Sequence, residues 1–409
     1  MIRYARWLLA ITAACLPLYA VRWDYGRLPT TLLENLVVAT VLVYLVALWR
    51  ERQLGRLLSL RTAYDIPILL LLLAGVVSLL VARDHRAALG LYKAYFIEPV
   101  VLFYVATDLL RQRDDFRTLL LGFGIGTSLF ALLNIGYFIA AFVTNTVQYG
   151  APPSAIYTSS NEVAMFLEPP AAFATAFFLF SDQRRDRRLA LAWAICLGVA
   201  LILTFSRGAY LALAVFAVLT LITVRPGLRR PLLAIAVVAA ALVVVTIVVA
   251  SNTPLMESRF SYVALNYTLQ TRSIIYVATW QMLTAHPILG LGLGGYLYVL
   301  HGFPEIYPHD VYLAFWAELG LLGLVAFAII LGGLLWRGRR ALPQAAGFER
   351  ALLWGALGSF VLWGVHGIFD TPYWKNDMSV EFWLVAAIEV AAIRRLVSNP
   401  SPKEPAGRP

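Results

Sequence analysis

The stretch Val311-Tyr-Leu-Ala-Phe-Trp-Ala-Glu318-Leu-Gly320, which continues without another charge to Trp336, decides the class of this protein. A helix of about 20 apolar residues crosses the roughly 30 Å of hydrocarbon in a bilayer. Similar runs recur on both sides of it, and the 409 residues are 60% hydrophobic and only 14% charged. Soluble globular proteins carry about 25% charged residues. The sequence therefore predicts an all-α, polytopic membrane protein.

The apolar runs predict about twelve transmembrane helices. They are Trp7–Val21, Leu32–Trp49, Ile66–Ala82, Ala94–Leu110, Thr118–Ala141, Val163–Phe180, Leu189–Phe205, Ala209–Val224, Leu232–Ala250, Val311–Trp336, Ala351–Ile368 and Ser379–Ile393. Residues 1–250 would hold nine helices, 251–310 one large outward loop, 311–396 three helices, and 397–409 a disordered tail. Cys15 and Cys196 lie in apolar runs, which indicates neither a disulfide framework nor a metal site.

The basic residues indicate the orientation of these helices. Most of the 33 Lys and Arg residues fall at the termini and in alternate loops. Because cytoplasmic loops carry the excess of Lys and Arg, we expect both termini in the cytoplasm. Orientation also explains the net charge of +10 better than nucleic acid binding does. The basic residues expected outside are Arg22, Arg27, Arg83, Arg86, Lys93, Arg207, Arg259, Arg272 and Lys375.

The turn Thr204-Phe-Ser206-Arg207-Gly208-Ala-Tyr210 predicts an anion-binding position between two short spans. Ser206 can cap the following helix through its hydroxyl, and the N-terminus of that helix presents free N–H groups and a positive dipole end. Arg207 beside it is a candidate phosphate ligand. The alternative is a plain helical hairpin whose arginine reaches the headgroups.

The outward loop supplies further candidates between Ser251 and Gly320. Arg272 begins a possible short helix, Arg272 to Ala285, which would lie along the bilayer surface, and headgroup contact is the alternative role for its arginine. The run Gly290–Gly295 lacks the Lys-Ser/Thr ending of a nucleotide-binding loop, so it predicts close backbone packing or a turn with positive φ.

Several titratable residues could carry proton chemistry. His309 can exchange a proton near neutral pH, although an ordinary interfacial histidine is the alternative. Asp310 is too close in sequence to be assumed to orient the same ring. Glu318 would lie inside the bilayer and face a cavity or a partner. The other carboxyl groups expected in spans belong to Glu98, Glu168 and Glu389, and proton-coupled transport would use such groups.

Three of these stretches resemble motifs of the O-antigen ligase family, within the wider group of bacterial O-antigen ligases and polymerases. Thr204 to Tyr210 is similar to the Ser-Arg-Gly turn of that family. Arg272 with His286-Pro-Ile-Leu-Gly-Leu-Gly-Leu-Gly294 is similar to its arginine and His-Pro-glycine loop. His309 to Gly323 is similar to its His-Asn-x-Tyr-Leu motif, with Asp310 where the family often has Asn. The resemblance covers about residues 204–323.

The resemblance implies an all-helical membrane glycosyltransferase with one large periplasmic loop. It would transfer a glycan from undecaprenyl diphosphate to the lipid A–core at the periplasmic face of the bacterial inner membrane. We expect His309 to act as the base that activates the acceptor hydroxyl, with a pKa near its ordinary value of about 6.5. Other candidate residues are Arg207, Arg272, Arg86 and Lys93 for the diphosphate, and Ser206, Asn161, Asp310 and Glu318 for shaping or supporting the cavity.

The residues also bear on cofactors and on alternative functions. The outward carboxylates show no Asp-x-Asp spacing, so we expect transfer without a metal or other cofactor. A single displacement at the anomeric carbon would invert its configuration. The alternative is that Asp370 and Asp377 meet Asp310 in space. Expected partners are the lipid-linked donor, the lipid acceptor and membrane lipids, but no nucleic acid. A polymerase with the same donor is the first alternative function. A proton-coupled transporter is the second, although no repeat typical of transporters is found.

Overall fold

The computed structural model describes residues 1–26, 28–147, 152–224, 262–300 and 302–398. The expected ninth span, Leu232–Ala250, and the outward residues Arg27 and Arg259 lie outside these ranges. The first half of the described chain contains α1 (Ile2–Ala14), η1 (Leu16–Ala20), β1 (Arg22–Tyr25), β2 (Leu28–Thr31), α2 (Leu32–Arg50), η2 (Leu54–Ser59), α3 (Asp65–Val81), α4 (His85–Tyr92), η3 (Lys93–Ile97), α5 (Glu98–Leu109) and α6 (Arg113–Val143).

The second half carries the elements around the outward loop. They are α7 (Ser160–Phe180), α8 (Arg184–Leu203), α9 (Arg207–Thr223), α12 (Tyr262–Ala285), β3 (Tyr298–Leu300), β4 (Phe303–Glu305), α13 (Val311–Ala341), η4 (Leu342–Gln344), α14 (Gly347–His366) and α15 (Asn376–Ser398). The strands form two short antiparallel hairpins, β1 with β2 and β3 with β4. The protein is therefore mostly helical, as expected.

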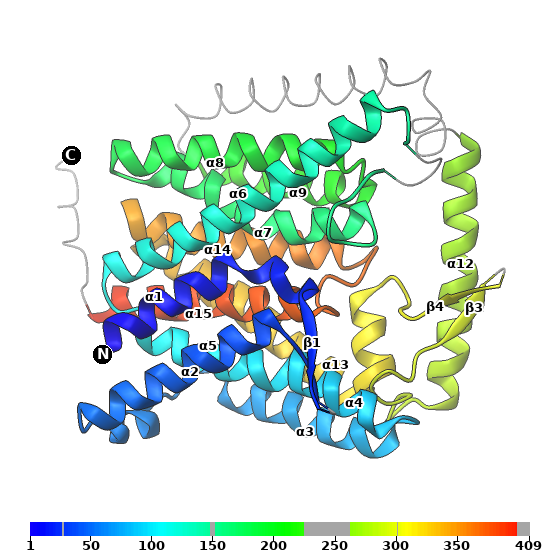
Figure 1. Ribbon diagram of the computed structural model, residues 1–409, viewed down its shortest axis with the longest axis horizontal. Helices are drawn as coiled ribbons and strands as arrows, with labels where there is room; N and C mark the ends of the chain where they lie inside the picture. The colour runs from blue at the N-terminus through cyan, green and yellow to red at the C-terminus, as the bar shows by residue number, and fades with distance from the viewer. Residues whose placement is uncertain (27, 148–151, 225–261, 301, 399–409) are drawn as a thin grey trace, which may run out of the picture.

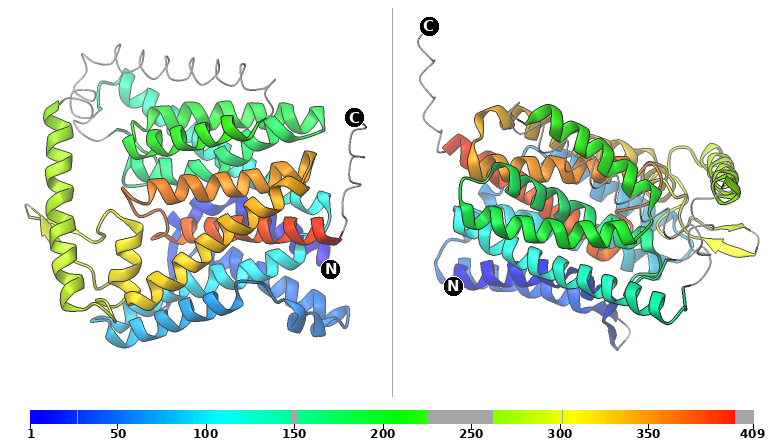
Figure 2. Two further views of the ribbon diagram at one scale, coloured as in Figure 1. Left: turned by 180° about the vertical axis from the view of Figure 1, so that it is seen from behind. Right: turned by 90° about the horizontal axis from the view of Figure 1, so that it is seen from above.

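Most helices run side by side as one bundle (Figure 1). α12 lies across one end of this bundle with the β3–β4 hairpin beside it, and both views in Figure 2 show the same arrangement. The beginning of α1 and the end of α15 lie at the opposite end. The outward loop and the chain ends are thus on opposite sides of the bundle, which agrees with an even number of spans.

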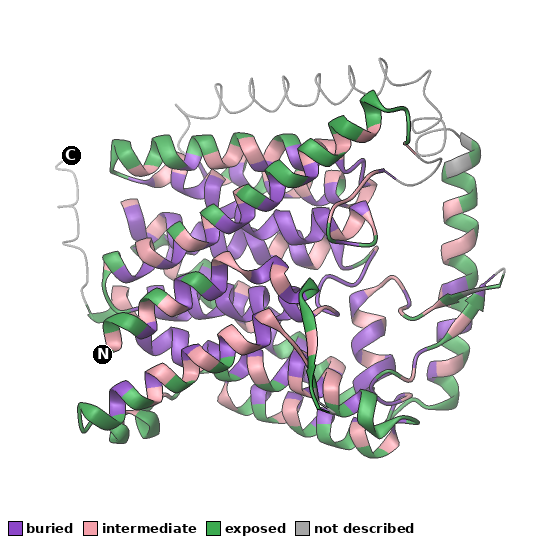
Figure 3. Ribbon diagram, viewed as in Figure 1, coloured by how far each residue is buried: buried purple, intermediate pink, exposed green. Residues whose placement is uncertain are grey.

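The centre of the bundle is formed by α7, α14 and α15 (Figure 3). In α15 every residue from Asn376 to Ala392 is buried. Glycines bring neighbouring helices together, because a Cβ at Gly122 or Gly126 of α6 would overlap the backbone of α1, and one at Gly355 of α14 would overlap Phe173 of α7. Small residues allow this close approach in membrane helices, where lipid provides no hydrophobic force between them.

Five of the described helical segments are long and apolar enough to cross a membrane. They are Leu32–Arg50, His85–Leu109, Arg113–Val143, Ser160–Phe180 and Val311–Gln344, and the shorter Asp65–Val81 and Arg207–Thr223 are also apolar. Each expected span outside residues 225–261 overlaps a described helix. The number twelve and the boundaries of the four expected parts of the chain remain predictions.

Three helices differ in detail from the expected spans. The first α-helix ends at Ala14 and continues as the 3₁₀ turn η1, which contains Pro17. Before Pro99 the chain forms the π-turn η3, because proline cannot donate the helical hydrogen bond and the preceding turn widens. α12 is 24 residues long and begins at least ten residues before Arg272, so the expected helix Arg272 to Ala285 is only its second part.

Candidate active site

A cavity of about 140 Å³ lies under α12, at the end of the bundle opposite the chain termini. Four separate parts of the chain line it: the start of α7, the middle of α12, the end of β4, and His309 two residues before α13. The lining residues are Asn161, Tyr267, Thr268, Thr271, Arg272, Ile275, Glu305 and His309. The cavity therefore brings Asn161, Arg272 and His309, three of the expected site residues, into one place.

Arg207 reaches the same place from the start of α9. Phe205, two residues before Arg207, has φ of 50°. Ser206 is the N-cap of α9, and its hydroxyl accepts a hydrogen bond from the Ala209 amide. The Arg207 Nη2 atom donates to the Thr268 hydroxyl at 2.9 Å, and Thr268 lines the cavity. Its Nη1 atom is buried and has no hydrogen-bond partner among the described residues. A buried guanidinium nitrogen without an acceptor is costly, so an anion is the natural partner.

Arg272 fastens α12 to the segment that follows α14. Its guanidinium donates to the carbonyl of Phe369. One turn along α12, the Tyr276 hydroxyl lies 3.3 Å from the carbonyls of both His309 and Ile368. These bonds hold the arginine over the cavity, next to the residues that flank His309.

His309 lies between two carboxylates. Its Nδ1 is 3.4 Å from Asp370 Oδ1, and its Nε2 is 3.2 Å from Glu305 Oε2. Burial opposes the charged imidazolium, but the hydrogen bonds to Asp370 and Glu305 outweigh it and raise the pKa of His309 to about 9. The pKa therefore differs from the expected value near 6.5, because the sequence analysis paired His309 with neither carboxylate, and Asp370 is 61 residues away.

The two carboxylates respond in the opposite sense. The hydrogen bond from His309 lowers the pKa of Glu305. Asp370 is more deeply buried, yet the bond and the charge of His309 lower the pKa of Asp370 as well. Asp370 also accepts a hydrogen bond from Asn161 Nδ2 at 3.2 Å. All three ionisable groups are thus charged near neutral pH.

Asp310 and Glu318 have structural contacts. Asp310 caps α13 by accepting from the Leu313 amide at 2.9 Å. The carboxylate of Glu318 accepts from the Gly294 amide and, at 3.2 Å, from the Tyr296 amide. Glu318 is not among the residues that line the cavity, and its carboxylate holds the backbone of the glycine run, so its role in supporting the cavity stays a prediction.

The run Gly290–Gly295 packs backbone against backbone, as expected. Gly290, Gly292 and Gly294 have φ between +69° and +84°. A Cβ at Gly292 would lie 2.6 Å from the Ala82 amide at the end of α3. The Ser78 hydroxyl of α3 accepts from the Leu293 amide at 2.7 Å and donates to the Glu318 carbonyl at 2.6 Å. The run therefore joins α3 to α13.

Arg86 and Lys93 do not line the cavity. Lys93 forms ion pairs with Glu34 at 3.0 Å and Glu98 at 3.8 Å. Arg86 is in the exposed helix α4. Of the four candidate cations, Arg272 lines the cavity and Arg207 is bonded to Thr268 in its wall, and the binding of a diphosphate there stays a prediction.

Sequence reasoning missed Glu305 and the role of Asp370. Asp370 appeared only as a possible metal ligand together with Asp377 and Asp310. Instead Asp377 is buried in α15 and bonded to Tyr157, while Asp310 caps a helix. In the described ranges no group of three His, Cys, Asp or Glu side chains is placed to hold a metal ion. Glu305, four residues before His309, could have been found from that spacing.

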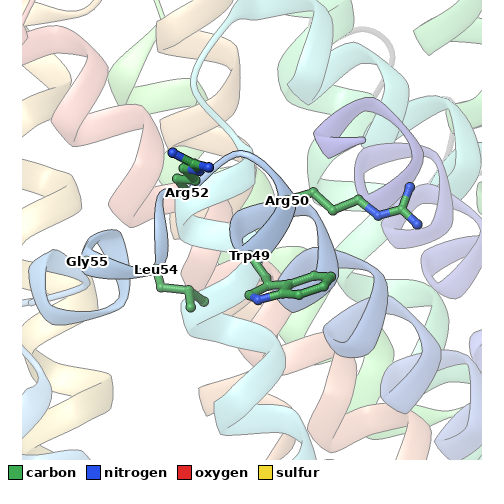
Figure 4. Close-up of a pocket in the computed structure, with 5 residues that line it drawn as sticks. All are labelled: Trp49, Arg50, Arg52, Leu54 and Gly55. Atoms are coloured by element: carbon green, nitrogen blue, oxygen red, sulfur yellow. The ribbon is translucent and has the colours of Figure 1, made fainter.

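A larger hollow, of about 550 Å³, lies at the opposite end of the bundle and is lined by Trp49, Arg50, Arg52, Leu54 and Gly55. Figure 4 shows the guanidinium groups of Arg50 and Arg52 pointing away from each other. Because these charges do not converge, the smaller cavity under α12 is the better candidate for an active site.

Residues 190–328 match the model of a family described as O-antigen ligase. The matched segment contains Arg207, Arg272 and His309, together with the glycine run and α12. A search among curated proteins found no match to the chain. The family match confirms the family that the three sequence motifs indicate.

Proposed function

We propose that this protein is an O-antigen ligase, since residues 190–328 match the model of that family. It transfers a glycan from undecaprenyl diphosphate to a hydroxyl group of the lipid A–core. The reaction takes place at the periplasmic face of the inner membrane, under α12. The family match supports a membrane enzyme that acts on polyprenyl-linked glycans, and the donor and acceptor named here are the specific proposal.

The observation that carries this proposal is one small cavity lined by Arg272 and His309, with Arg207 bonded to Thr268 in its wall. Arg207 and Arg272 come from elements far apart in the chain, and the Nη1 atom of Arg207 has no protein partner in the described ranges. In the transfer the bond from the anomeric carbon to the diphosphate breaks, and the departing oxygen gains negative charge. Guanidinium groups aimed at that oxygen stabilise the transition state without a metal.

His309 and its carboxylates supply the acceptor half of the reaction. With its pKa at about 9, His309 is charged before substrates bind, and Glu305 occupies Nε2. We infer that the Nε2 proton of His309 passes to the Glu305 carboxylate, and from it to water, as the acceptor hydroxyl takes the place of Glu305 at Nε2. The ring, now neutral, accepts the hydroxyl proton at Nε2 as the oxygen attacks the anomeric carbon. A single displacement inverts the configuration at that carbon.

The buried carboxyl groups that a proton-coupled transporter would use have separate surroundings. Glu98 lies 3.8 Å from Lys93, Glu168 is bonded to His366, and Glu389 lies near Gly338 of α13. They do not line one cavity among those found in the described chain. These contacts favour transfer over transport.

The lipopolysaccharide banding pattern of a deletion strain tests the proposal. A ligase leaves core-only lipopolysaccharide while full-length glycan accumulates on the lipid carrier. A polymerase instead leaves core with a single repeat unit, and a normal pattern contradicts both enzymes. Complementation with the wild-type chain and with an Arg272→Ala variant, compared at equal membrane levels, connects the phenotype to the cavity.

A further inference from the structure

A buried Glu168–His366 pair lies directly behind the candidate active site and takes no part in the mechanism above. Glu168 belongs to α7, and His366 is the last residue of α14. The His366 Nδ1 atom is 2.8 Å from Glu168 Oε1, and each side chain is only 1% exposed. Burying such a pair costs free energy, and apolar residues of similar volume often stabilise a protein as well or better. The pair therefore calls for an explanation other than stability.

The ring of His366 packs against the turn that carries Arg207. A Cβ on Gly208 would lie 2.9 Å from both Cδ2 and Nε2 of His366. Gly208 is the neighbour of Arg207 in the first turn of α9. The absence of a side chain at position 208 thus lets the ring touch the backbone that sets the position of Arg207.

The backbone of His366 holds the other side of the cavity. Its carbonyl accepts hydrogen bonds from the amides of Phe369 at 2.8 Å and Asp370 at 3.0 Å. Phe369 in turn provides the carbonyl that binds Arg272, and Asp370 provides the carboxylate beside His309. His366 therefore contacts Gly208 beside Arg207, and its carbonyl holds the segment that binds Arg272 and His309.

We propose that the Glu168–His366 pair is a positioning device, which keeps the Arg207 turn and the Phe369–Asp370 segment at a fixed separation across the cavity. Glu168 fixes the rotation of the imidazole through Nδ1, and the ring then serves as a spacer against Gly208. Neither residue touches the substrate. The role rests on the proposed transfer reaction, because the separation matters only if both arginines bind one diphosphate.

Substitutions at Gly208 and His366 test the spacer directly. In nanodiscs, Gly208→Ala should weaken binding of undecaprenyl diphosphate and raise the donor KM about tenfold, a change of about 1.4 kcal/mol. In a His366→Ala background the same Gly208→Ala change should cost less than about twofold, because the new methyl group occupies space that the ring has left. Equal effects of Gly208→Ala in the two backgrounds would overturn the spacer role.

Substitutions at Glu168 distinguish its hydrogen bond to the His366 ring from its charge. Glu168→Gln keeps an oxygen that accepts from the imidazole N–H, so donor KM should stay within about threefold of wild type. Glu168→Ala loses the bond and should raise donor KM about tenfold. A Gln variant as impaired as the Ala variant would contradict a positioning role.

Two control variants guard against general packing effects. Gly358→Ala would meet Phe216 within the bundle, so it should lower the yield of folded protein but leave donor KM unchanged. Glu389→Gln changes another buried carboxyl group, one that does not line the cavity, and should leave both the yield and donor KM unchanged. Wild-type protein that neither binds undecaprenyl diphosphate nor transfers glycan would refute the proposed function. An active wild type with no coupling between positions 208 and 366 would refute the positioning role alone.

Discussion

At the scale of single residues, the site is marked by backbone conformations that side chains rarely adopt. Phe205, two residues before Arg207, has φ of 50°, and His309 has φ of 52°. A non-glycine residue in this region costs of order 1–3 kcal/mol and persists only when its surroundings enforce it. Here the surroundings are the Ser206 cap and the Tyr276 bond to the His309 carbonyl. The strain therefore lies beside the two groups that the proposed reaction needs most.

Replacing either arginine should remove most of the transfer activity. Arg207→Ala and Arg272→Ala should each lower kcat/KM by about 10² or more, because a donor to the leaving group is lost. Lysine should restore only part of it, since it lacks the planar pair of donors. Initial rates of purified protein measure this, with Arg86→Ala as a cation control outside the cavity. Wild-type rates in either Ala variant would exclude that arginine from the site.

The pH profile should report the carboxylates around His309. Because the base form of a group with pKa about 9 increases as the pH rises, kcat/KM should increase from pH 7 towards 9. Glu305→Gln removes one bond that raises this pKa, so the rising limb should move to lower pH. A rate profile of the two proteins checks the shift. His309→Gln with full activity and an unchanged profile would show that the ring only packs.

Transfer should persist in excess EDTA. The motive is the pair of arginines at the cavity, which can neutralise a diphosphate without a cation. Assays with and without chelator, using undecaprenyl-diphosphate glycan and lipid A–core, test this expectation. Activity that disappears with EDTA and returns with Mg²⁺ or Mn²⁺ would point to the carboxylates Glu305 and Asp370 instead.

At the scale of elements, a break in α13 accommodates the glycine run. Gly320 has φ of 70° and ψ of −176° inside the helix, and the Leu321 amide there bonds to the Ile288 carbonyl at 2.9 Å. Just before the break, the Ala317 carbonyl accepts from the Leu291 amide at 2.6 Å. The interrupted helix thus exchanges its own hydrogen bonds for bonds to the loop, which fixes the end of α12 relative to α13.

Gly320→Ala should therefore destabilise the protein. An alanine at this φ and ψ costs of order 1–3 kcal/mol, and its Cβ would also overlap the Ile288 carbonyl. The apparent melting temperature in detergent, followed by loss of the monodisperse peak, should fall by several degrees. Gly332→Ala is the matched control in the same helix, because a Cβ there has no neighbour within 4 Å. Equal melting of the two variants would contradict this account of the break.

At the scale of the whole molecule, the ends of the bundle differ in their chemistry. The end with the chain termini carries ion pairs between arginines and carboxylates, such as Arg113 with Glu349 at 2.7 Å and Arg56 with Asp108 at 2.6 Å. The opposite end carries α12 and the β3–β4 hairpin (Figures 1 and 2), and the cavity lined by α12 residues is at this end. This asymmetry agrees with the expected orientation, in which the basic end faces the cytoplasm.

Cysteine labelling should establish the orientation. In a background without Cys15 and Cys196, cysteines near Arg185 and Arg339 should be shielded from an impermeant thiol reagent in whole cells. A cysteine near Glu305 should react once the outer membrane is permeabilised. Labelling at position 339 in intact cells would reverse the assigned sides.

Local signals in the chain were enough to predict some features of the site. The apolar runs predicted the helices, Ser206 was predicted to cap the helix that follows it, and the glycine run was predicted to adopt positive φ values. Each of these features depends on residues within one or two turns of the chain. The family followed from three such motifs. These features needed no knowledge of which helices are neighbours.

The partners of each charged group were decided only by the tertiary structure. Asp370 lies 61 residues from His309, and His366 lies 198 residues from Glu168. Lys93 forms an ion pair with Glu34, which is 59 residues away in the sequence, and sequence spacing did not indicate this partner. Charge–charge and hydrogen-bond energies fall steeply with distance in space, and helix packing, which sequence spacing does not reveal, sets that distance. The pKa of His309, on which the proposed chemistry depends, is therefore set by the tertiary structure.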